Sequence, residues 1–157
     1  MEFKQSWAVL QEKHPGFCAL LRTIYSSEDP VDAKMTRARQ ALEYMLQARC
    51  LSLHRAYTDI HKTLGMLQQK GDMEDFYALQ AHIVRAVANT YIHATLASLM
   101  QGQVQTARTQ QDLEEVGRAL CVVVDWFLEK EGLQQGPTPS PQKATIRIVE
   151  KLAQEEG

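Results

Sequence analysis

Residues 76–100 read FYALQAHIVRAVANTYIHATLASLM, and this segment is apolar almost all the way round a helix. A helix that is apolar on every side normally lies buried in a larger core. One line of polar side chains interrupts the segment, at His82, Asn89 and His93. Buried polar groups need hydrogen-bond partners, and histidines can also hold a ligand or a metal ion. The segment therefore predicts a buried helix whose polar side chains either bridge to neighbouring helices or form a binding site.

Helix breakers divide the N-terminal half of the chain into helical segments. Pro15 and Gly16 separate a first helix from a shorter one that ends near Tyr25. Residues 31–70 contain no proline and a glycine only near their end, so we expect one long helix there. Gly71 then ends this helix in a short turn. A short turn makes the helices on either side of it antiparallel neighbours.

A further helix is expected after residues 102–111, which form a polar loop. Its apolar positions, from Leu113 to Phe127, repeat at helical spacing, and Gly132 ends it. The sequence lacks the alternating runs of β-branched residues that would predict strands. The chain therefore predicts an all-α fold, an antiparallel helical bundle with four main helical segments over residues 1–132.

The C-terminal part of the sequence has a different organisation. Residues 133–141 contain two Pro-x-Pro steps, which cannot continue a helix and indicate a semi-rigid linker. Residues 142–157 then predict a short amphipathic helix, whose apolar edge consists of Ile146, Val149 and Leu152. This helix either packs on its own bundle or docks in a groove of a partner or of a second copy of the protein.

The composition argues against several classes of protein. At 157 residues the chain is long enough for one domain, and its net charge of −2 gives no basic surface for nucleic acid or anionic membranes. It shows neither a signal-peptide pattern nor an apolar run of the length that spans a membrane. The three cysteines are far apart, which indicates reduced, buried thiols. We therefore expect a cytoplasmic protein.

Histidines on two predicted helices suggest a binding function. At about 100° per residue, Cys50, His54 and His61 share one side of the long predicted helix. The polar line of residues 76–100 can face them if the two helices are antiparallel neighbours. Helical bundles build metal sites from side chains on facing helices. The candidate ligands for a transition metal or a small molecule are Cys50, His54, His61, His82, Asn89 and His93.

Residues 49–54, Arg-Cys-Leu-Ser-Leu-His, form an Arg-x4-His arrangement. This arrangement resembles the signature of HEPN-type helical ribonucleases. The resemblance implies that Arg49 and His54, paired across a dimer, hold the scissile phosphate and assist proton transfer. Cys50 stands where that family usually has a polar residue, and the pattern lies in an earlier helix than it does in the family.

Common catalytic motifs are missing from the sequence: it has no Gly-rich phosphate loop, Ser-His-Asp order, Cys-x-x-Cys pair or His-Glu-x-x-His. We therefore expect a non-enzymatic interaction module, such as an adaptor, a chaperone-like protein or an assembly subunit. It would use apolar helix faces to bind a protein partner or itself, without a cofactor. The candidate interface residues are Trp126, Ile146, Val149 and Leu152. A sensor of a metal or a small ligand is the first alternative, and a ribonuclease is the second.

Overall fold

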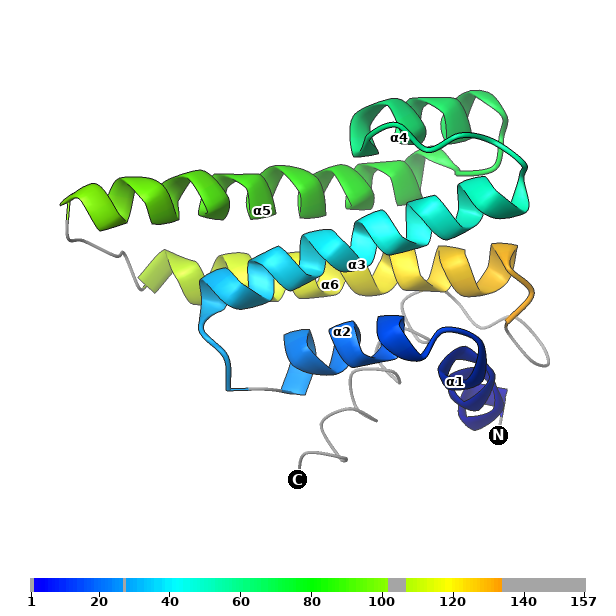
Figure 1. Ribbon diagram of the computed structural model, residues 1–157, viewed down its shortest axis with the longest axis horizontal. Helices are drawn as coiled ribbons and strands as arrows, with labels where there is room; N and C mark the ends of the chain where they lie inside the picture. The colour runs from blue at the N-terminus through cyan, green and yellow to red at the C-terminus, as the bar shows by residue number, and fades with distance from the viewer. Residues whose placement is uncertain (1, 27, 102–106, 134–157) are drawn as a thin grey trace.

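The computed structural model describes residues 2–26, 28–101 and 107–133, and all regular secondary structure in these residues is helical (Figure 1). The predicted all-α class is therefore confirmed. The helices of the described chain are α1 Glu2–Lys13, α2 Pro15–Ser26, α3 Val31–Ser52, α4 Ile60–Gln69, α5 Asp75–Gln101 and α6 Ala107–Lys130. Most of the expected linker at 133–141 and the whole helix expected at 142–157 lie outside the described residues.

The central helix of the fold is α3. It packs against α2, α4, α5 and α6, and α5 packs in turn against α4 and α6. Figure 1 shows that α3 and α6 run in the same direction and that α5 runs opposite to both. The short α4 lies beside the end of the molecule at which α3 ends and α5 begins. Among the described helices, none combines the length and the hydropathy that a membrane crossing needs.

The prediction of one helix over residues 31–70 is wrong. Helix α3 ends at Ser52 and α4 begins at Ile60, so a seven-residue connection separates them. The side chain of Asp59 starts α4 by accepting a hydrogen bond from the Lys62 N–H at 2.7 Å. Aspartate is among the preferred residues at this capping position, because its carboxylate satisfies a backbone N–H that has no partner within the helix.

The end of α3 is a Schellman turn with histidine in the position that usually holds glycine. His54 has a φ of 55°, in the left-handed region, and its N–H donates to the Leu51 carbonyl at 3.1 Å. The Arg55 N–H reaches back to the Cys50 carbonyl at 2.8 Å. These two bonds satisfy carbonyls at the helix end. Helix α3 therefore ends where the sequence has neither a glycine nor a proline.

The same turn ends α4 and α6, this time with glycine. Gly71 and Gly132 have φ angles of 73° and 65°. The N–H of Asp72 donates to the Leu67 carbonyl at 2.9 Å, and the N–H of Leu133 donates to the Leu128 carbonyl at 2.8 Å. The expected helix ends at both glycines are confirmed.

Exchange of His54 for glycine is expected to raise the free energy of unfolding by about 0.5–1 kcal/mol. The exchange removes the cost of holding a side chain in the left-handed region, and the greater freedom of glycine in the unfolded chain offsets part of that gain. Urea denaturation measures the change. In the matched control, Gly71→Ala, the reverse exchange should lower the free energy of unfolding by about 1 kcal/mol. A destabilised H54G protein would contradict this account of the turn.

The segment that is buried all round is the C-terminal half of α6. Every residue from Cys121 to Leu128 is buried, and the helix packs against both α3 and α5. The predicted apolar stripe of this helix is confirmed, because Val116, Leu120 and Phe127 have no exposed surface. The core of the molecule therefore lies around α6 and the facing sides of α3 and α5.

The three cysteines are buried, as predicted: Cys18, Cys50 and Cys121. The Cys121 thiol donates a hydrogen bond to the Tyr25 hydroxyl at 2.9 Å, and that hydroxyl donates to the Gly117 carbonyl at 2.6 Å. A Cβ atom at Gly117 would lie 3.3 Å from the Tyr25 ring, so the missing side chain lets Tyr25 approach the backbone of α6. Burial raises the pKa of Cys121 to about 12. The thiol is therefore protonated at neutral pH and is not an activated nucleophile.

Candidate functional site

Helix α5 presents an apolar face to the outside of the molecule. Its core side consists of buried Tyr77, Ala78, Ala81, Val84 and Ala88. The opposite side carries five apolar residues, here called the outer stripe of α5: Phe76, Leu79, Ile83, Ala86 and Val87. Phe76 is 45% exposed and Leu79 is 58% exposed. The expectation that this segment is buried all round is therefore wrong, because no described helix covers the outer stripe completely.

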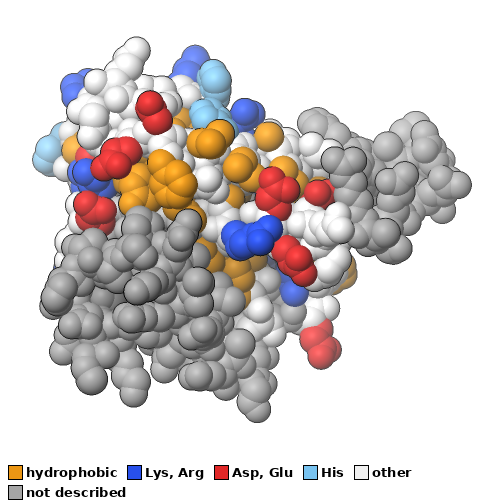
Figure 2. All heavy atoms as spheres, turned by 180° about the vertical axis from the view of Figure 1, so that it is seen from behind, with side chains coloured by type: hydrophobic (Ala, Val, Ile, Leu, Met, Phe, Trp, Pro, Cys, Tyr) orange, Lys and Arg blue, Asp and Glu red, His pale blue; other side chains and the backbone are white. Residues whose placement is uncertain are grey.

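The spacing within the outer stripe is that of a helix-packing surface. At 3.6 residues per turn, its five members fall within an arc of about 100°. Steps of three and four residues lead from Phe76 through Leu79 and Ile83 to Ala86. Single exposed hydrophobic residues are normal, whereas a repeat of apolar residues at three- and four-residue steps is the spacing found where one helix packs on another. Figure 2 shows hydrophobic side chains gathered on one face of the molecule, with charged groups beside them.

Trp126 lies in the core and has no exposed surface. Its indole N–H donates to the backbone carbonyl of Asp72 at 2.8 Å. It therefore does not act as a surface anchor in this fold, and the interface prediction for this residue is corrected to a packing role. The other three candidate interface residues, Ile146, Val149 and Leu152, lie outside the described residues.

The end of α3 divides the predicted line of Cys50, His54 and His61, because His61 belongs to α4. His54 is exposed in the turn after α3. Cys50 is buried, and its burial raises the pKa of its thiol, an effect that a hydrogen bond from Thr63 reduces. These three side chains therefore do not form the single row that a continuous helix would have given.

His61 and His82 do come together, across the contact between α4 and α5. Their ring centroids are 6.0 Å apart and the rings are inclined at 57°. Burial lowers the pKa of His82, and the nearby charges of Arg85 and His61 lower it further. Asn89 is half-buried on α5, and the side chain of His93 lies outside what the structure describes. Within the described part of the chain, His, Cys, Asp and Glu side chains nowhere gather in threes as a metal site.

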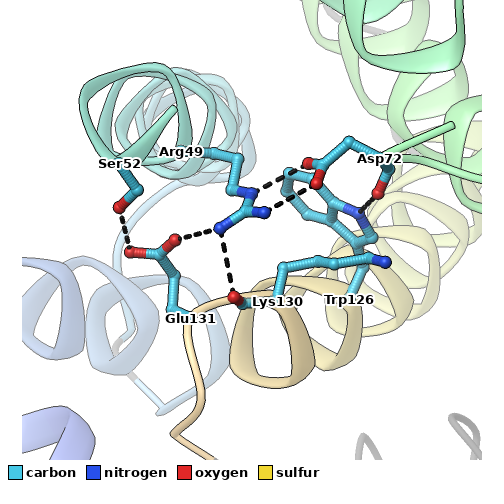
Figure 3. Close-up of polar contacts among 6 residues, drawn as sticks. All are labelled: Arg49, Ser52, Asp72, Trp126, Lys130 and Glu131. Carbon is cyan, nitrogen blue, oxygen red and sulfur yellow. Dashed lines mark hydrogen bonds and ion pairs between the residues drawn. The ribbon is translucent and has the colours of Figure 1, made fainter. Parts of the chain in front are cut away.

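A polar cluster surrounds Arg49 (Figure 3). Its guanidinium donates two bonds to the Asp72 carboxylate, from Nε at 2.8 Å and from Nη2 at 2.6 Å. Its Nη1 donates to the Glu131 carboxylate at 2.7 Å and to the Lys130 carbonyl at 3.1 Å. Ser52 donates to the second oxygen of Glu131 at 2.8 Å. We call these residues, with Trp126, the Arg49 cluster.

The Arg49 cluster ties together the ends of three helices. Arg49 stands in the last turn of α3, Asp72 follows the end of α4, and Lys130 is the last residue of α6. The C-terminal end of a helix carries partial negative charge, so a cation is favoured where three such ends meet. The hydrogen bonds that Arg49 donates to Asp72 are the main cause that raises the pKa of Arg49 above its ordinary value. The cluster holds a permanent charge in a fixed position.

This arrangement bears on the ribonuclease alternative. The Arg49 side chain is 13% exposed, and Asp72 and Glu131 are each 12% exposed. A phosphate group would have to displace two carboxylates from a guanidinium that already donates four hydrogen bonds. His54 lies beyond the helix end in an exposed turn. Arg49 therefore has a complete structural role within this chain.

The sequence contains one signal that points toward the Arg49 cluster. Asp72 and Glu131 each stand next to a glycine that ends a helix. Arg49, in the last turn of α3, lies within reach of both carboxylates. The pairing itself is not local, because 23 and 82 residues separate Arg49 from its two carboxylate partners.

Comparison of the chain with protein-family descriptions, with curated protein sequences and with solved structures gives no match. The functional interpretation therefore depends on the geometry described above.

Proposed function

We propose that the protein is a non-enzymatic helical interaction module that binds an apolar helix through the outer stripe of α5. The observation that carries this proposal is the exposure of Phe76 and Leu79 on a helix whose opposite side is fully packed. Because the stripe has the spacing of a helix-packing seam, its natural occupant is another helix. The simplest occupant is α5 of a second copy, since a two-fold dimer brings the same surface together with itself.

In this proposal the rest of the fold is the scaffold that supports α5. We regard α2, α3, α5 and α6 as the four main segments of an antiparallel bundle, which holds α5 in place. The net charge of −2 supports a protein partner rather than nucleic acid, and we place the module in the cytoplasm.

The energetics of the outer stripe favour weak association. Complete burial of a Leu or Phe side chain contributes about 1.5–3 kcal/mol. About half of that contribution is still available when Phe76 and Leu79 are covered by a partner, because roughly half of each side chain is already covered in the free protein. Association itself costs at least about 4 kcal/mol. The exposed halves of these two side chains, counted on both copies of a dimer, contribute about 3–6 kcal/mol. A dissociation constant in the micromolar range therefore also requires the rest of the stripe and the C-terminal segment.

The apolar edge of the C-terminal segment can strengthen this association. Ile146, Val149 and Leu152 repeat at helical spacing after a linker of nine residues. We propose that this segment docks on a partner molecule next to the outer stripe. Removal of the last seventeen residues should then weaken the dimer, and a truncated protein that associates as tightly as the full chain would restrict the interface to α5.

Substitution of Leu79 by serine is expected to weaken self-association by about tenfold or more, because it removes the most exposed large side chain of the outer stripe. Phe76→Ser should have a similar effect. Sedimentation velocity over a range of about 5–500 μM measures the dissociation constant. The matched control is Leu51→Ser, because Leu51 is 77% exposed but lies on α3, outside the stripe.

Two results would contradict the proposal. In the first, the unmutated protein remains monomeric over the whole concentration range. In the second, the Leu51 variant loses association to the same extent as the Leu79 variant, which would mean that exposed leucines act non-specifically.

A further inference from the structure

Two histidines from different helices lie close together where α4 packs on α5. His61 is in the first turn of α4, and its side chain is exposed. His82 is half-buried on α5, and the two ring centroids are 6.0 Å apart. Histidine side chains reach the surface beside basic groups in the upper part of Figure 2. The pair is a separate feature from the outer stripe of α5.

The distance between these rings suits a shared metal ion. Zinc bonds an imidazole nitrogen at about 2.0–2.1 Å, and one ion bonded to two imidazoles holds their centroids about 5–6 Å apart. The observed separation is at the upper end of that range, so a small rotation of the exposed His61 ring can complete the geometry. Imidazole nitrogen is a ligand that suits zinc, copper and nickel.

We propose that His61 and His82 form a two-histidine site for a divalent transition-metal ion such as Zn²⁺, which links α4 to α5. The ion would take one nitrogen from each ring and water at its remaining positions. The site has an open approach, because His61 is exposed. It differs from a structural zinc site, in which protein side chains supply all four ligands.

The surroundings limit the affinity of this site. Burial and the charge of Arg85 lower the pKa of His82, which leaves its imidazole neutral and able to bind metal near pH 7. The same Arg85 charge repels a cation. With two protein ligands and this repulsion, we expect binding that is clearly weaker than that of a site with four protein ligands.

Metal binding at this position would act on α4. The helix is short, runs over Ile60–Gln69, and packs against α5 and α3. It contributes buried Ile60, Leu64 and Leu67 to the core. A metal ion between His61 and His82 holds the start of α4 against α5 and stabilises the folded chain, because the unfolded chain does not keep the two rings together.

The test is a thermal melt of protein without an affinity tag, with and without Zn²⁺ as the chloride and with EDTA as a reversal. Saturating Zn²⁺ is expected to raise the melting temperature by about 2–6 °C. His61→Gln and His82→Gln should each abolish this rise. His54→Gln is the matched control, because His54 is an exposed histidine outside the pair and should leave the rise intact.

A spectroscopic measurement makes the test independent of stability. In proton NMR spectra, the imidazole signals of His61 and His82 should shift together on addition of Zn²⁺, while those of His54 stay in place. Three results would overturn the proposal: no rise in the unmutated protein, a rise that survives both glutamine variants, or a rise that depends on only one of the two histidines.

Discussion

Replacement of Arg49 by methionine is expected to lower the free energy of unfolding by about 3 kcal/mol. Methionine keeps most of the side-chain volume but leaves the nearly buried carboxylates of Asp72 and Glu131 without the cation that both contact. Loss of one partner from a buried ion pair is costly, because the remaining charge has neither water nor an opposite charge. Urea denaturation monitored by circular dichroism measures the change.

Two variants separate the causes of this effect. Arg49→Lys keeps the charge but cannot donate the two parallel bonds to Asp72, so it should lose about 1–2 kcal/mol. Arg37→Met removes an exposed arginine from the same helix and should change the free energy of unfolding by less than about 0.5 kcal/mol. An Arg49→Met protein as stable as the Arg37→Met protein would show that the cluster does not hold the helix ends together.

Replacement of Trp126 by alanine is expected to lower the free energy of unfolding by about 3–5 kcal/mol. The side chain is completely buried, and its loss leaves a large cavity next to the Asp72 backbone. Trp126→Phe should cost less, about 1–2 kcal/mol, because it keeps most of the packing and loses the indole N–H donor. Similar losses for the two variants would mean that the hydrogen bond, and not packing, dominates.

Trp126 and Arg49 are also expected to be coupled, because both bind Asp72. The indole holds the backbone carbonyl of Asp72, and the guanidinium holds its carboxylate. A double-mutant cycle of Trp126→Phe with Arg49→Met should give an interaction energy above about 0.5 kcal/mol. Strict additivity would show that the two contacts act on Asp72 independently.

The fold class and most helix ends could be predicted from the sequence because they depend on local signals. Glycine at positions 71 and 132 predicts a left-handed residue that closes a helix, and the structure has both. The end of α3 could not be predicted in this way. Apolar residues continue at helical spacing on both sides of the break. His54 takes the left-handed conformation although it is not glycine, the residue that usually indicates such a helix end. The start of α4 at Ile60 did carry a signal, the capping residue Asp59.

The candidate sites depend on packing between distant segments, so the sequence could predict them only in part. Residues 61 and 82 stood on two polar lines that could face each other only if their helices were antiparallel neighbours. In the structure the two rings do lie close together, but His61 reaches His82 from a separate helix, α4. The sequence also showed that α5 is apolar all round. Which of its sides lacks a neighbour depends on where α4 and α6 pack, and no local pattern contains that information.

The most direct test of the outer stripe of α5 is a concentration series of carbon-13 methyl NMR spectra, with Leu79 and Leu51 as paired reporters. Both leucines are strongly exposed in the single chain, so any difference between them reports on where association occurs. We predict that the methyl signals of Leu79 and Ile83 shift or broaden as the protein concentration rises, while those of Leu51 do not change. Signals of Leu79 that stay constant up to the highest concentration, or changes at Leu51 without changes at Leu79, would contradict the assignment of α5 as the docking helix.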